Sequence, residues 1–82
     1  MQRNPEITIT SDDLRDRVED KLDRMIPTGV WTRAEAYARR KIELYRQRWP
    51  EAGIYDDDYL VELAADTVRE TELADLLKGV PA

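Results

Sequence analysis

The hydrophobic positions of the chain recur with two different periods. Near the N-terminus, residues 7–10 read I-T-I-T, so apolar and polar residues alternate and every one is β-branched. This alternation is typical of a β-strand with one buried face. Beyond this segment the apolar residues recur every three or four positions, as they do along one face of an α-helix. The pattern therefore predicts one short strand followed by helices.

The first two helices are predicted from their apolar stripes and from residues that favour helix ends. The first helix is expected to begin at Ser11 or Asp12 and to end at about Ile26, just before a proline. The second is expected to begin at Thr32, because the stretch T-R-A-E starting there has the sequence of a capping box. It is expected to close before Pro50.

A third helix is predicted in the C-terminal part of the chain. Its expected N-cap is Asp57 or Asp58, which follow a tyrosine and precede an apolar stripe. The apolar residues lose their phase farther on, so we expect a break near residues 70–71, with Thr71 as a second N-cap. A short final helix would then end at Gly79.

A strand of four residues needs a partner for its backbone N–H and C=O groups, and no second strand is predicted. A second copy of the chain would provide one, through antiparallel pairing across a two-fold axis. Ile7 and Ile9 would then face a shared core, and Thr8 and Thr10 would face outward. We therefore expect a mostly α fold, with a short N-terminal strand, paired across a homodimer, followed by three helices. A small α-helical bundle is the alternative.

The order of strand, helix, glycine turn and capped helix over residues 7–49 resembles the ribbon-helix-helix family. The matching stretches are I-T-I-T, the stripe of Leu14, Val18 and Leu22, and G-V-W-T-R-A-E-A beginning at Gly29. In that family two chains intertwine, and their paired strands lie in the major groove of DNA. The resemblance therefore implies a homodimer that binds operator DNA.

The resemblance also implies which residues contact the DNA. Thr8 and Thr10 take the positions that read bases, and Thr32 and Arg33 take the phosphate position at the start of the second helix. Arg3, on the N-terminal arm, is expected to add a contact to the DNA backbone.

Charge is unevenly distributed along the 82 residues. Residues 1–50 hold 11 basic and 9 acidic residues, a net charge of +2, whereas residues 51–82 hold 2 and 9, a net charge of −7. Such asymmetry suggests two surfaces with different partners. We expect residues 1–53 to form the dimerisation and DNA-binding half. Residues 54–82 are expected to form an acidic helical segment that binds a basic protein partner or packs on the first half.

Aromatic and acidic residues are the candidates for contact with a protein partner. Tyr37 and Leu44 lie off the apolar stripe of the second helix, whereas Trp31, Tyr45 and Trp49 lie on it and are expected in the core or the dimer interface. The candidate partner-binding residues are Tyr37, Leu44, Tyr55, Asp57, Asp58, Tyr59 and Glu62.

The composition argues against catalysis, because the chain lacks both histidine and cysteine, the commonest catalytic base and the strongest nucleophile. No cofactor and no metal site are expected, since the three aspartates at 56–58 lack the calcium-loop pattern and are explained by helix capping. No apolar run is long enough to span a bilayer, and no signal peptide is recognised. We therefore expect a cytoplasmic protein that is not an enzyme.

Two functional hypotheses remain open at this point. The first is a small prokaryotic or phage regulatory protein: a DNA-binding homodimer resembling a ribbon-helix-helix repressor or antitoxin, with an acidic C-terminal helix that binds a protein. The second is an acidic helical protein-binding module without DNA contact, such as an inhibitor encoded by a phage or mobile element. Its acidic half would occupy a basic surface of the target.

Overall fold

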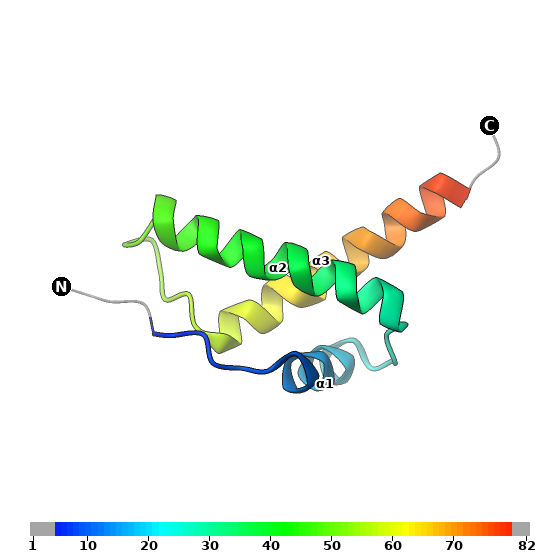
Figure 1. Cartoon of the computed structure of the whole chain (residues 1–82), viewed down its shortest axis with the longest axis horizontal. Coiled ribbons are helices and arrows are strands. Elements are labelled where there is room, and N and C mark those ends of the chain that lie inside the picture. Colours follow the sequence, from blue (N-terminus) through cyan, green and yellow to red (C-terminus); the bar gives the residue numbers. More distant parts are fainter. Residues whose placement is uncertain (1–4, 80–82) are drawn as a thin grey trace.

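The computed structural model describes residues 5–79, which form three α-helices and, over that range, no β-strand (Figure 1). The helices are α1 (Ser11–Leu22), α2 (Thr28–Arg48) and α3 (Asp57–Gly79). α2 and α3 cross each other, and α1 packs against α3 (Figure 1). The predicted N-terminal strand, paired across a homodimer, is therefore wrong, and the alternative of a small α-helical bundle is right.

The backbone of residues 7–10, which is expected from the sequence to pair with a second strand, is bound instead by side chains of its own chain. The carboxylate of Asp57 accepts hydrogen bonds from the N–H groups of Thr8 (3.1 Å) and Ile9 (3.4 Å). Arg39 donates to the carbonyl oxygen of Ile9 (3.1 Å). Because these charged groups satisfy the backbone donors and acceptor, the segment needs no partner strand.

The alternation of the N-terminal segment is nevertheless retained. Ile7 and Ile9 are half-buried and pack against the core, whereas Thr8 and Thr10 are exposed. Extended backbone places successive side chains on opposite sides whether or not a neighbouring strand is present. The alternation therefore predicted the buried face correctly and the secondary structure incorrectly.

α1 is shorter than predicted, ending at Leu22 rather than near Ile26. Asp23 adopts a left-handed conformation (φ 56°), which ends the helix. Two α1 side chains then bind the peptide groups of Ile26: Glu19 accepts its N–H (2.7 Å), and Arg15 donates to its carbonyl oxygen. These contacts hold the buried Ile26 in the connection between α1 and α2 instead of in a further turn of α1.

α1 begins at Ser11, one of the two predicted positions, but Ser11 is not its cap. Its N-cap is Thr10 rather than Ser11, because the Thr10 hydroxyl accepts the N–H of Asp13 (3.2 Å). The Ser11 hydroxyl is thereby free to accept the indole N–H of Trp31 (3.2 Å) and to donate to Glu35 (2.7 Å). Ser11 therefore ties the start of α1 to α2.

α2 begins four residues earlier than the capping box predicted. Pro27 is the N-cap, and the N–H of Trp31 already donates to its carbonyl oxygen (2.9 Å). The Thr32 hydroxyl donates to the carbonyl of Thr28 (2.9 Å) instead of accepting a capping bond. Glu35 does not complete the capping box, because its carboxylate accepts hydrogen bonds from Ser11 and Arg39 instead.

The cap of α3 is one residue earlier than predicted. The carboxylate of Asp56 accepts the N–H of Tyr59 (2.9 Å), and its carbonyl oxygen accepts the N–H of Leu60 (3.0 Å). Asp57 and Asp58, the expected caps, are the first residues of the helix, where negative charge is also favoured.

The predicted break in α3 at residues 70–71 is absent, and the helix is continuous to Gly79. Thr71 is not a second N-cap: its hydroxyl donates to the carbonyl oxygen of Thr67 (2.7 Å), one turn earlier in the same helix. The loss of phase that suggested a break has another cause. Past Thr71 the helix keeps its geometry but its leucines face solvent.

The core draws on all three helices and on the segments that connect them. Its buried residues are Leu14, Val18, Ile26, Trp31, Ala34, Ala38, Ile42, Tyr55, Leu60, Ala64, Ala65 and Val68. Four of these are alanines on α2 and α3, whose small side chains allow two crossing helices to approach closely. The first 50 residues and the acidic remainder of the chain, which differ in net charge, therefore contribute to one shared core.

Candidate protein-binding surface

Four aromatic side chains lie in a continuous row between the end of α2 and the start of α3. The ring of Tyr45 is 5.8 Å from that of Trp49 and 6.2 Å from that of Tyr55, measured between centroids. Tyr55 in turn meets Tyr59 edge to face at 5.0 Å. Separations of this size are favourable for aromatic pairs. We call Trp49, Tyr45, Tyr55 and Tyr59 the aromatic row.

The row is buried in its middle and open at its ends. Tyr55 is 5% exposed, whereas Trp49 is 52% and Tyr59 36% exposed. Ile54, beside Tyr55 in the chain, is 61% exposed. The buried Tyr55 therefore anchors a set of apolar groups that face solvent.

Trp49 is expected from the sequence in the core or the dimer interface, and its exposure excludes the core. Trp49 continues the apolar stripe of α2, but it is the C-cap residue, where the helix runs past the core. The guanidinium of Arg48 lies 5.7 Å from its ring centroid, which is within cation–π range. The spacing of apolar residues shows which face of a helix a residue lies on, but it does not show at which residue along the helix the core ends.

The environment of Tyr59 favours its neutral form. Burial raises the pKa of the Tyr59 hydroxyl, and the neighbouring Tyr55 and Tyr45 raise this pKa further. Tyr59 therefore stays protonated well above neutral pH and keeps a hydroxyl donor at the edge of the aromatic row.

Tyr37 and Leu44, the other uncharged residues predicted to bind a partner, lie outside the aromatic row. They are seven residues apart on one face of α2 and are 52% and 45% exposed. Tyr37 lines a groove of about 340 Å³ between α2 and α3, together with Arg33 and Lys41. Only Tyr55 and Tyr59, among the predicted partner-binding residues, belong to the row.

The acidic residues predicted to bind a partner are engaged within the molecule. Asp57 holds the N-terminal segment, and its second oxygen accepts the Thr8 hydroxyl (3.2 Å). Asp58 pairs with Arg17 of α1 at 3.2 Å. Glu62 likewise pairs with a basic residue of α1, Lys21, at 2.7 Å.

Further ion pairs join α3 to the basic part of the chain. Arg33 donates two hydrogen bonds to Asp75 (2.8 and 2.7 Å), and Lys41 pairs with Glu70 at 3.3 Å. Arg24, after α1, pairs with Glu72. The net charge of −7 in residues 51–82 is therefore largely offset by basic residues of the first half of the chain. Counting charges along the sequence does not reveal this pairing.

The residues expected to contact DNA are spread over the N-terminal segment, the cap of α1 and α2, and most of them bind other residues of the chain. Thr8 binds Asp57, Thr10 caps α1, and Thr32 lies in the second turn of α2. Arg33 is held by Asp75. Arg3 lies outside the described residues.

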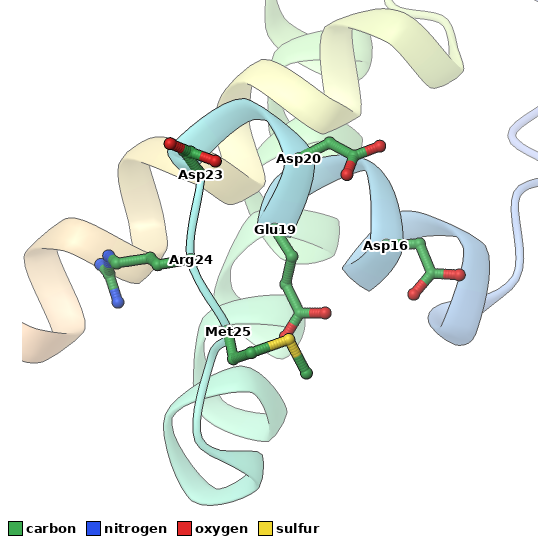
Figure 2. A pocket seen from close by; sticks show the side chains of 6 residues that line it. All are labelled: Asp16, Glu19, Asp20, Asp23, Arg24 and Met25. Atoms are coloured by element: carbon green, nitrogen blue, oxygen red, sulfur yellow. The ribbon is translucent and has the colours of Figure 1, made fainter.

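Unpaired negative charge is concentrated on α1 and at its C-cap, in the half of the chain whose net charge is positive. Within residues 5–79, no side-chain hydrogen bond or ion pair engages the carboxylates of Asp12, Asp13, Asp16, Asp20 and Asp23. Asp16, Asp20 and Asp23 border a hollow of about 490 Å³ at the end of α1, together with the 77% exposed Met25 (Figure 2). Figure 2 shows that their carboxylates point in different directions, and no metal-binding group of three acidic residues exists in the described part of the chain.

The Arg33–Asp75 pair predicts a specific pH dependence. The hydrogen bonds from Arg33 lower the pKa of Asp75 below its ordinary value of 3.8 and raise that of Arg33. Stability from this carboxylate is thus present above pH 3.8 and is lost as the pH falls through the lower folded-state pKa. We expect the urea midpoint of the native protein to exceed that of Asp75→Asn at about pH 6, and the gap to close by about pH 2. An equal gap at both pH values would contradict this assignment.

None of the helices in the described range combines the length and the apolar character needed to cross a membrane. Comparisons of the chain with protein-family models, with curated proteins and with solved structures gave no match.

Proposed function

We propose that this protein is a non-enzymatic helical module that binds another protein through its aromatic row. The observation that supports the proposal is the exposure of Trp49 and Tyr59 at the two ends of a row whose middle residue is buried. Tryptophan and tyrosine are enriched among the residues that carry most of the binding energy in protein interfaces.

The row is also suited to binding because it is already ordered. Each ring packs on its neighbour, and Arg48 lies over Trp49. Ordering flexible side chains on binding costs free energy and reduces affinity, and a partner of this protein does not incur that cost at the aromatic row. The exposed Ile54 extends the apolar area beside the row.

The charge of the module favours a partner with a basic surface. The whole chain has a net charge of −5, and the unpaired aspartates lie on α1 and at its C-cap. Complementary charge accelerates encounter and selects partners even where it adds little affinity. An inhibitor encoded by a phage or mobile element, directed at a basic site of its target, has these properties.

Protein binding is better supported than operator binding. The DNA-contacting arrangement required a paired strand that presents Thr8 and Thr10, and that strand is absent. Arg33, expected at a phosphate, donates to Asp75. The resemblance to ribbon-helix-helix proteins therefore plays no part in this proposal.

The proposal predicts that Trp49 carries much of the binding energy. A photo-crosslinking amino acid at Gln47, on the exposed end of α2, identifies the bound protein in a cell lysate by mass spectrometry. Titration calorimetry with that purified partner is then expected to show that Trp49→Ala weakens binding by about 30-fold, from a loss of about 2 kcal/mol.

The matched control is Leu73→Ala, an exposed apolar residue far along α3 from the row. It is expected to leave the affinity unchanged. Equal affinity of the native protein and Trp49→Ala, with circular dichroism showing both folded, would overturn the role of the aromatic row.

A further inference from the structure

Two arginines of α2 bind backbone carbonyl oxygens of the N-terminal segment, residues 5–10. Arg39 donates to the carbonyl of Ile9 and Arg46 to that of Pro5, each at 3.1 Å. The arginines are two helical turns apart, a rise of about 10.5 Å, and four residues of extended chain span about 13 Å. These lengths are similar, so both arginines reach the segment at once. Because the later arginine binds the earlier carbonyl, the segment runs antiparallel to α2 (Figure 1).

α2 itself holds both arginines in place. Arg39 also donates to Glu35 at 3.0 Å, and Arg46 pairs with Glu43 at 3.3 Å. Each guanidinium therefore uses one nitrogen for a glutamate of its own helix and presents another to the segment. Little side-chain freedom is lost when a backbone binds to donors that are already oriented.

The contacts at the start of α3 also read mainly the backbone of the segment. Asp57 accepts the N–H groups of Thr8 and Ile9, and the Thr8 hydroxyl provides the one side-chain hydrogen bond to this carboxylate. Ile7 and Ile9 face the other way and pack against the core. Backbone atoms thus make most of the polar contacts, and two alternate apolar side chains make the buried ones.

We propose that Arg39, Arg46 and Asp57 form a site for an extended peptide of a partner protein, and that residues 5–10 occupy this site as an internal substitute. We call these three residues the peptide site. Backbone hydrogen bonds combined with selection of alternate side chains are a recurring mode of peptide recognition. None of the three residues belongs to the aromatic row, so the inference does not rest on the function proposed above.

The segment that occupies the site indicates the chemistry of the peptide. The peptide has β-branched apolar residues at two alternate positions, as Ile7 and Ile9 are, with a serine or threonine between them whose hydroxyl reaches Asp57. Proline is excluded at the two positions that correspond to Thr8 and Ile9, because their N–H groups bind the carboxylate.

The segment can leave the site without unfolding the helices. Thr8 is exposed, and Ile7 and Ile9 are only half-buried. Segments with few buried contacts and exposed hydrogen bonds open locally at a much lower free energy than the whole domain. A peptide presented by a partner therefore competes for the site each time the segment opens. The attached segment has an effective concentration of about millimolar, so a free peptide competes with it poorly.

Peptide binding to a variant with an open site tests the proposal. Ile7→Ser/Ile9→Ser removes the apolar side chains of the segment and leaves the peptide site unchanged. Fluorescence anisotropy with a labelled synthetic peptide, P-E-I-T-I-T, is expected to show saturable binding to this variant. Binding to the native protein is expected to be at least about tenfold weaker, because the attached segment competes. Circular dichroism verifies that the variant is folded.

Controls on both sides define the site. Adding Asp57→Ala to the open variant is expected to weaken peptide binding at least about tenfold, whereas adding Asp58→Ala, whose side chain is 87% exposed, should leave it unchanged. A peptide with serine in place of both isoleucines should not bind. Thr8→Pro opens the site in a second way, since it removes an N–H that binds Asp57 and keeps both isoleucines.

Three outcomes would overturn the proposal. The first is no saturable binding of the peptide, at concentrations up to about 1 mM, by either open variant. The second is equal binding by the native protein and the open variants, which would place the peptide elsewhere. The third is a native protein that sediments as a dimer and an Ile7→Ser/Ile9→Ser variant that is monomeric, which would assign the site to the same segment of a second copy.

Discussion

Replacement of Leu60 by alanine is expected to lower the free energy of unfolding by about 2–5 kcal/mol, the usual cost of truncating a fully buried leucine. Leu60 is 0% exposed and lies in the first turn of α3, the helix on which both α1 and α2 pack. A domain of this size has a total stability of only about 4–12 kcal/mol, at roughly 0.05–0.15 kcal/mol per residue. The variant is therefore expected to lose a large part of its stability.

Urea unfolding followed by circular dichroism measures this loss. Leu76→Ala makes the same chemical change on the same helix at a position that is 69% exposed. It is expected to change the stability of the folded monomer by less than about 0.5 kcal/mol, as surface substitutions usually do. Similar losses for the two variants would contradict the burial of Leu60 in the core.

Replacement of Asp57 by alanine is expected to release the N-terminal segment and to cost about 1.5–3 kcal/mol, the range for hydrogen bonds to a charged group. The Asp57 carboxylate binds the N–H of Thr8, the hydroxyl of Thr8 and, at longer range, the N–H of Ile9. Without it, these donors lose their acceptor, and Ile7 and Ile9 are held less firmly against the core. Amide hydrogen exchange is expected to become faster at Thr8 and Ile9 and to change little in the middle of α2.

Asp58→Ala provides the matched control, because Asp58 follows Asp57 in the same helical turn. Its side chain is 87% exposed and pairs with Arg17 at the surface. An exposed pair of this kind contributes about 0–1 kcal/mol. Slow exchange at Thr8 in the Asp57→Ala variant, matching the native protein, would show that the segment is held by something other than Asp57.

Several features of the fold follow from local patterns and were predicted correctly. The three helices exist because their apolar residues recur at helical spacing, which depends on neighbours along the chain. The buried face of the N-terminal segment also follows from local alternation, and Ile7 and Ile9 do face the core. Helix ends were less accurate, since Thr10, Pro27 and Asp56 are the N-cap residues and α2 begins at Thr28 instead of Thr32.

The candidate surface was only partly predictable. Tyr55 and Tyr59 were chosen from the sequence because they are aromatic, but Trp49 was assigned to the core or the dimer interface, and it is 52% exposed. The signal that would have corrected this was the position of Trp49 immediately before Pro50, where α2 has to end. Past the last turn of a helix, an apolar stripe can extend beyond the residues that would bury it.

The sequence by itself determined that three segments of the chain are helical and which face of each is apolar, because both properties arise from residues within one or two turns of each other. Only the tertiary structure decided what binds the backbone of residues 8 and 9, since Asp57 is about fifty positions away along the chain. It also decided which charges are neutralised, as pairs such as Arg33–Asp75 join separate helices. Contacts across the fold depend on how helices pack in three dimensions, and no local pattern records that packing.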